Sequence, residues 1–117
     1  MSYEFVVLPA GAVASPGDVA AYVFTQQGIP VDTQLQRLVV AGLHVWNARL
    51  PAIYRHAKVD IEAAGNIVRV LPADRYDRRW TRSKAVDSSA TAVLCFLADL
   101  TVGRYLLYDA EENELWA

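Results

Sequence analysis

The sequence predicts an α+β fold of the ferredoxin-like kind, a split β-α-β sandwich in which an antiparallel sheet carries helices on one face. The first reason is the order of strand-like and helix-like segments, which is β, α, α, β, β, α, β with a short strand at the end. The second is a tight turn between two neighbouring strand segments, which makes them antiparallel. The third is length, because 117 residues without a repeat or linker are typical of a single domain, residues 1–117.

The first strand and the first helix follow from local composition. Residues 3–8 are rich in β-branched and aromatic side chains, and a proline ends the run. The four consecutive apolar residues 5–8 indicate a strand that is covered on both faces. Ser15 is a good N-cap for a helix whose first residue is Pro16, and Gly28 is a natural stop for that helix.

The second helix has the clearest pattern in the chain. Asp32 or Thr33 can cap its start, and Pro51 ends or bends it. Its apolar residues recur with the helical period of 3.6 and share one side: Leu35, Leu38, Val39, Gly42, Leu43, Trp46 and Leu50. We therefore expect a long helix that packs this side against the sheet.

A hairpin follows the second helix. Residues 59–63 alternate apolar with polar side chains, which predicts a strand with one face in water. Residues 64–66 can turn, and residues 66–71 then form the antiparallel partner. The alternation places Asp60 and Glu62 together on the solvated face of the sheet.

The last part of the chain predicts one helix and two strands. Ser88 or Ser89 can cap the helix, and Gly103 is a natural end for it. Residues 105–108 then form a strand, and residues 115–116 return beside it as a short edge strand after a polar turn.

Composition bounds the class of protein. Apolar residues make up 54% of the chain and charged residues 21%, which is too apolar for a disordered chain. No apolar run approaches the ~20 residues that a membrane-spanning helix needs, so we expect no membrane partner. The single cysteine excludes an internal disulfide and fits a reducing compartment. We therefore expect a cytoplasmic protein.

The strongest candidate site is the basic aromatic segment 75–84, which holds five of the eleven basic residues. Arginine, tyrosine and tryptophan are enriched where protein interfaces are anchored, and they also suit phosphates and stacked bases. The net charge of −2 opposes a polyanion, which ranks another protein above a nucleic acid as the partner. The residues expected to contact it are Arg75, Tyr76, Arg78, Arg79, Trp80 and Arg82. A solvated charged loop without a function is the other interpretation.

A second candidate surface is acidic and lies near the C-terminus. Its members are Asp109, Glu111, Glu112 and Glu114. The simplest interpretation is a turn kept in water between two strands. The same carboxylates could equally be presented to a basic surface of a partner, by electrostatic complementarity. The opposite signs of the two clusters also allow a homodimer.

The spacing of reactive residues does not point to a catalytic or metal centre. His44 and His56 are separated by Pro51, unlike the histidine pairs that one helix presents to a metal. Cys95 falls mid-helix between apolar neighbours, where a thiol behaves as a small apolar group. We expect no catalytic residue, no metal and no cofactor.

Two other classes of function stay open. A small enzyme or ligand-binding protein would need His56, Asp60, Tyr76 and Arg78 to converge on one pocket. A nucleic-acid-binding module would use the basic aromatic segment 75–84, and its affinity would fall steeply with added salt.

The two ends of the chain resemble a family of proteins. The opening Met1-Ser2-Tyr3-Glu4-Phe5 runs straight into a strand, and the ending Tyr105-Leu106-Leu107-Tyr108-Asp109 is followed by a polar turn and Leu115. Both are similar to small bacterial α/β proteins encoded beside polymorphic toxins, which are suspected immunity proteins. The resemblance implies a cytoplasmic, non-enzymatic antitoxin whose partner is a toxin. The basic aromatic segment is not part of the family's pattern, so the resemblance assigns no functional residue.

Overall fold

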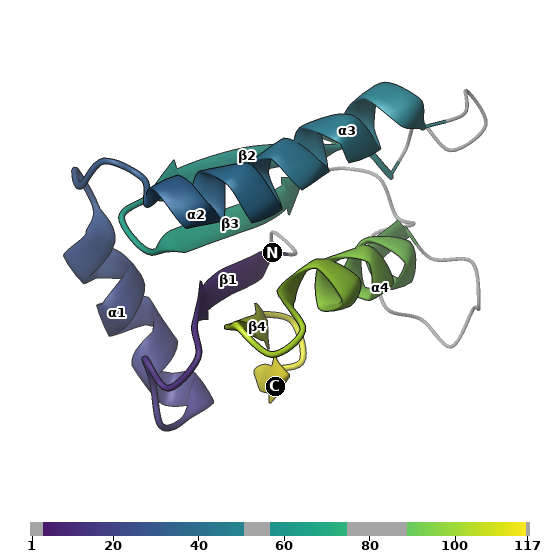
Figure 1. Cartoon of the computed structure of the whole chain (residues 1–117). Helices are drawn as coiled ribbons and strands as arrows, with labels where there is room; N and C mark the ends of the chain where they lie inside the picture. Colours follow the sequence, from purple (N-terminus) through teal and green to yellow (C-terminus); the bar gives the residue numbers. More distant parts are fainter. Residues whose placement is uncertain (1–3, 51–56, 75–88, 117) are drawn as a thin grey trace.

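The computed structural model describes residues 4–50, 57–74 and 89–116, which form a five-stranded antiparallel sheet with helices packed on it (Figure 1). The strand order is β2-β3-β1-β4-β5. The strands are β1 (Phe5–Pro9), β2 (Val59–Ala64), β3 (Ile67–Pro72), β4 (Tyr105–Asp109) and β5 (Glu114–Trp116). The α+β class and every strand expected from the sequence are confirmed.

The helices also fall where the caps and the apolar periods predict them. The first is a 3-10 turn, η1 (Pro16–Asp18), that leads into α1 (Val19–Gln26). The second runs without a break through α2 (Thr33–Leu35), the π-helical turn η2 (Gln36–Val40) and α3 (Ala41–Arg49). The last is α4 (Ser89–Thr101). No helix in the described ranges is long and apolar enough to cross a membrane.

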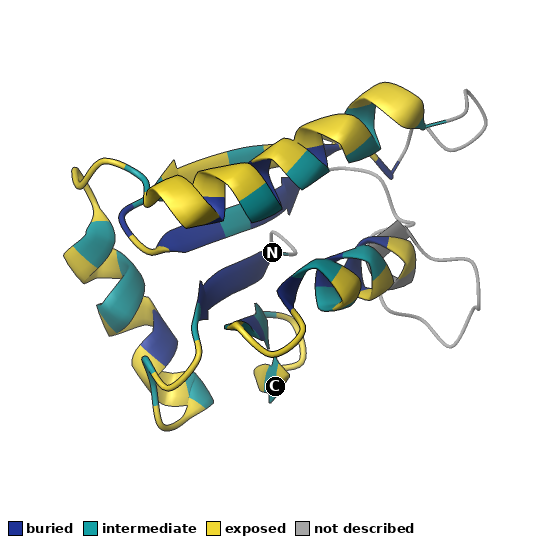
Figure 2. Ribbon diagram, viewed as in Figure 1, coloured by how far each residue is buried: buried dark blue, intermediate teal, exposed yellow. Residues whose placement is uncertain are grey.

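The strand β1 is buried on both faces and separates the two cores. Phe5 and Val7 point to the face that α2, η2, α3 and α4 cover. Val6 and Leu8 point to the opposite face, where α1 packs. Figure 2 shows β1 as a continuous buried strand between these layers. The expectation of helices on one face only is therefore wrong, because a strand that is apolar on both sides needs a cover on both sides.

The long helix and α4 touch each other as well as the sheet. The rings of Trp46 and Phe96 stack with their centroids 4.8 Å apart. Close by in the sequence, Gly42 lets the two helices approach, because a Cβ at that position would lie 3.0 Å from Cδ1 of Leu100. The apolar side predicted for the second helix is thus shared between the sheet and α4.

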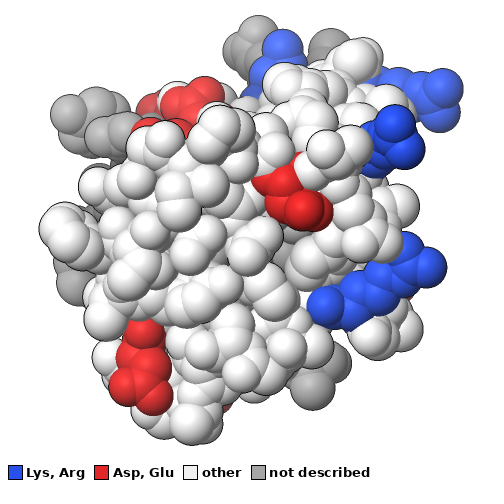
Figure 3. All heavy atoms as spheres, turned by 60° about the vertical axis from the view of Figure 1, so that its left-hand side comes forward, with Lys and Arg blue, Asp and Glu red and all other residues white. Residues whose placement is uncertain are grey.

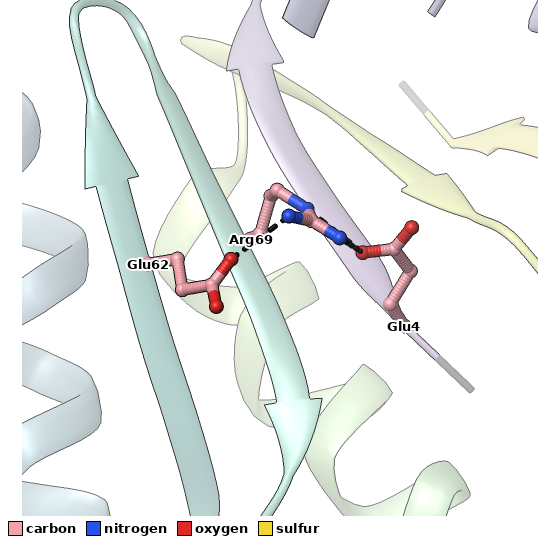
Figure 4. A network of polar contacts seen from close by, with 3 residues as sticks. All are labelled: Glu4, Glu62 and Arg69. Carbon is pink, nitrogen blue, oxygen red and sulfur yellow. Dashed lines mark hydrogen bonds and ion pairs between the residues drawn. The ribbon is translucent and has the colours of Figure 1, made fainter. Parts of the chain in front are cut away.

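The face of the sheet that carries α1 also bears a row of charged side chains, shown in Figure 4. Arg69 on β3 donates from Nε to Oε2 of Glu4 at 3.0 Å and from Nη1 to Oε2 of Glu62 at 2.8 Å. Glu4 precedes β1 and Glu62 lies on β2, so one guanidinium joins three neighbouring strands. Asp60 and Glu62 are exposed, which confirms the solvated face predicted for β2.

The chain passes from one face of the sheet to the other at the turn between β2 and β3. The N–H of Gly65 donates to the carbonyl of Ile29, and the N–H of Asp32 donates to the carbonyl of Gly65, both at 2.8 Å. The side-chain oxygen of Gln26 accepts a hydrogen bond from the N–H of Asn66 at 2.9 Å. These bonds fix the connection between α1 and α2 against the hairpin.

Candidate functional site

The basic aromatic segment lies outside the described residues. This applies to Arg75, Tyr76, Arg78, Arg79, Trp80 and Arg82. It applies also to His56, so only one member of the alternative pocket, Asp60, has a described position. Asp60 is exposed on β2.

The hairpin between β4 and β5 is the expected acidic surface, and one of its four acids faces inward. Asp109 is completely buried at the end of β4. Its Oδ1 accepts hydrogen bonds from the N–H groups of Glu111 at 3.1 Å and Glu112 at 3.3 Å. An aspartate at the start of a turn commonly bonds backbone N–H groups two and three residues later. Asp109 therefore does not belong to the exposed acidic surface expected from the sequence.

Tyr108 and Asn113 also support the turn between β4 and β5. Asn113 adopts a φ of 53°, a left-handed conformation that asparagine tolerates better than most residues. The hydroxyl of Tyr108 donates to Oδ1 of Asn113 at 2.8 Å. The three remaining acids, Glu111, Glu112 and Glu114, are exposed. We name these three carboxylates and the hairpin that carries them the acidic hairpin.

A shallow hollow of about 520 Å³ lies beside the acidic hairpin. Its lining combines the hairpin with the start of the 3-10 turn: Pro16, Asn113, Glu114, Leu115 and Trp116. Trp116 keeps 39% of its surface exposed. A large ring beside carboxylates resembles the composition of interface anchors, in which an aromatic side chain is surrounded by polar groups.

The segment that contains η1 and α1 carries little charge. From residue 10 to residue 31 the sequence contains one charged residue, Asp18. Figure 3 shows uncharged side chains over much of this side of the molecule, with separate acidic groups among and around them and basic side chains at the right-hand margin. Phe24 is 74% exposed and Ile29 is 48% exposed. Single exposed apolar residues are common on protein surfaces, so this side is not assigned to a site.

A second hollow, of about 500 Å³, lies where the long helix begins. Arg37 and Arg104 line it together with the N-cap Asp32. The nearby Tyr105 hydroxyl has a raised pKa, chiefly because the side chain is partly buried and secondly because of the Asp32 carboxylate, while Arg104 acts in the opposite direction. Arg37 and Arg104 were not expected to lie together, because 67 positions separate them in the sequence and neither lies in a charge cluster.

The remaining reactive side chains are scattered. His44 is exposed on α3. Cys95 lies within α4 as expected, but it is exposed, so it does not have the apolar surroundings predicted for it. Within the described ranges, no group of three or more His, Cys, Asp or Glu side chains could hold a metal ion. No protein-family model matches the chain, and no curated protein and no solved structure matches it.

Proposed function

We propose that this chain is a protein-binding domain and that the acidic hairpin, with Trp116 beside it, contacts a partner with a basic surface. The observation that carries the proposal is the support of the turn by Asp109, whose buried carboxylate bonds two of its backbone N–H groups. The backbone that carries the exposed carboxylates is thereby held in one conformation before any partner arrives.

This preorganisation matters energetically. A contact surface that is already ordered loses less conformational entropy on binding than a flexible one. Three carboxylates within four positions attract a basic partner over several ångströms and raise the association rate. A partly exposed tryptophan at the edge of the patch supplies apolar area that a charged surface alone lacks.

We propose further that the partner is a toxin, which the domain neutralises in the cytoplasm as an immunity protein. Support comes from the chain ends that resemble this family. The two ends lie side by side in the sheet, because β1 pairs with β4 and Phe5 is opposite Asp109. A carboxylate-bearing hairpin suits the positively charged active site of an enzyme that cleaves nucleic acid.

We also propose that the fold is the ferredoxin-like sandwich with additions. The strands β2-β3-β1-β4 are ordered so that β3 lies between β1 and β2, and β1 lies between β3 and β4. The long helix links β1 to β2, and α4 links β3 to β4, which gives two split β-α-β units. In this interpretation α1 and β5 are additions to the basic pattern.

The test is co-expression of the chain with the protein encoded immediately upstream of it. We expect the chain to restore growth to cells that express that protein, and to form a stable complex with it in gel filtration. Glu112→Lys should weaken the complex by about tenfold or more, mainly through a slower association rate. The matched control is Asp99→Lys, which makes the same change of net charge at an exposed position on α4.

The two parts of the proposal fail in different ways. Absence of any complex with the neighbouring protein would contradict the toxin as partner. A complex that Glu112→Lys and Asp99→Lys weaken equally would contradict the acidic hairpin as its contact surface.

A further inference from the structure

Among the described residues, β2 forms one edge of the sheet, and β5 of the acidic hairpin forms the other. Backbone N–H and C=O groups of successive residues in an antiparallel strand point alternately toward the neighbour and away from it. The carbonyl of Lys58 accepts from the N–H of Ala73 beside β3, so Lys58 faces inward. The alternation then directs the backbone groups of Val59, Ile61 and Ala63 outward, away from the sheet.

One end of this edge is closed by a side chain. Asn47 on α3 donates from Nδ2 to the carbonyl of Val59 at 2.9 Å, and its Oδ1 accepts from the N–H of Val59 at 2.9 Å. The carboxamide therefore pairs with Val59 as the backbone of a neighbouring strand would. No strand can add to the sheet at this residue while Asn47 occupies it.

The other end of the edge is closed by the connection between α1 and α2. The N–H and C=O of Gly65, two positions beyond Ala63, are bonded to Ile29 and Asp32 at 2.8 Å. Between the two closed ends, the outward groups of Ile61 and Ala63 have no hydrogen-bond partner in the described part of the chain. Unpaired edge groups of this kind accept an added strand.

We call residues 61–63, the part of the β2 edge between its two closed ends, the gap. The charged side chains beside the gap indicate which kind of partner could bind there. Asp60 and Glu62 are exposed on the face of β2 that carries Arg69. Arg69 is shared between Glu62 and Glu4, and the exposed Lys58 lies at one end of the same face. Among these described residues the three carboxylates of Glu4, Asp60 and Glu62 outnumber the two basic groups, so the strip has a small excess of negative charge. We propose that the gap binds an extended segment of another protein by strand addition, with basic side chains at alternate positions facing Asp60 and Glu62.

A second copy of this chain fits the gap poorly. Two β2 edges paired antiparallel would keep the same face of each sheet on the same side, which places Asp60 and Glu62 of both copies close together. Like charges on neighbouring strands are destabilising. The gap also spans only residues 61–63, so the added segment would make about four backbone hydrogen bonds and extend over about five residues.

This proposal is independent of the acidic hairpin, and the test separates the two sites. The probe is a capped, fluorescent peptide of alternating Lys and Val, and its counterpart has Glu in place of Lys. We expect the Lys peptide to bind about tenfold tighter than the Glu peptide in fluorescence anisotropy titrations. We also expect it to slow amide hydrogen exchange at Ile61 and Ala63, measured by NMR.

Two variants test the charge and the backbone separately. Asp60→Lys should weaken binding of the Lys peptide by about tenfold, whereas Asp99→Lys, with the same change in net charge, should have little effect. Ala63→Pro removes an outward N–H that is not used within the sheet, so it should weaken binding while the hairpin stays folded. Ala63→Ser retains the N–H and is its control.

Three results would overturn the proposal. The first is equal affinity of the Lys peptide for Asp60→Lys and Asp99→Lys. The second is equal affinity for Ala63→Pro and Ala63→Ser when both variants show native NMR spectra. The third is protection of residues 111–116 in place of Ile61 and Ala63, which would move the peptide to the acidic hairpin.

Discussion

The indole of Trp46 links three separate elements of the fold. Its ring stacks on Phe96 of α4 with an angle of 28° between the planes. Its Nε1–H donates to the carbonyl of Ala57, just before β2, at 2.9 Å. Trp46 lies on α3, so one side chain joins the long helix both to the last helix and to the chain that enters the edge strand.

Substitution of Trp46 should separate these two contributions. Trp46→Phe keeps a ring for the stack but leaves the buried carbonyl of Ala57 unpaired, and we expect it to lower the free energy of unfolding by about 1–2 kcal/mol. Trp46→Ala also removes the ring and should cost about 3 kcal/mol. The measurement is urea denaturation, with the exposed Val45→Ala as control. Equal costs for the two Trp46 variants would show that the stack contributes nothing.

Asp109 should matter for both stability and binding. Asp109→Ala removes the acceptor for the N–H groups of Glu111 and Glu112, and we expect a loss of about 2 kcal/mol in the free energy of unfolding. The exposed Glu112→Gln is the control and should change stability by less than about 0.5 kcal/mol. If the hairpin contacts a partner, Asp109→Ala should also weaken that complex at temperatures where the variant is folded. Unchanged stability of Asp109→Ala would contradict the supporting role of this carboxylate.

A side chain at Gly65 should destabilise the β2–β3 turn. Its φ is +49°, and a Cβ there would collide with Oε1 of Gln26, which accepts the N–H of Asn66. We expect Gly65→Ala to lower the melting temperature more than Gly11→Ala, because Gly11 also has a positive φ but open space around it. The backbone strain of about 1 kcal/mol is common to both, so the difference reports the collision. Equal melting temperatures would show that Gln26 moves aside without cost.

Tyr105 should make the fold sensitive to alkaline pH. Burial, and secondarily the Asp32 carboxylate, raise the pKa of its hydroxyl above the ordinary value of about 10. The unfolded chain therefore loses this proton at a lower pH than the folded chain. The contribution of Tyr105 to stability is complete below pH ~10 and is lost as the pH rises through the folded pKa.

This dependence can be measured by urea denaturation between neutral pH and strongly alkaline pH. Tyr105→Phe cannot ionise, so its stability should decline less steeply above pH ~10 than that of the wild type. Tyr108→Phe is a suitable control, because it removes a different tyrosine from the same strand. Parallel curves for wild type and Tyr105→Phe would contradict the effect.

Local sequence signals were sufficient to predict where the strands and helices lie along the chain. The side chain of Asp32 accepts a hydrogen bond from the N–H of Leu35, as expected for an N-cap. The alternation of apolar and polar residues along β2 predicted its solvent-exposed face. These signals succeed because capping and periodicity act between residues a few positions apart. The acidic hairpin could also be predicted from the sequence, because its acidic residues lie close together within one turn.

Local patterns therefore predicted the kind and order of the elements and the apolar side of each. They did not predict which face of the sheet α1 covers, that Asp109 turns inward, or that Asn47 closes one end of the β2 edge. These features depend on contacts between residues that lie far apart in the sequence or on the packing around them. A hydrophobic period along a helix or strand indicates which side is buried, but it does not identify the element that covers that side. Asn47 contacts Val59 only because the long helix packs across the sheet.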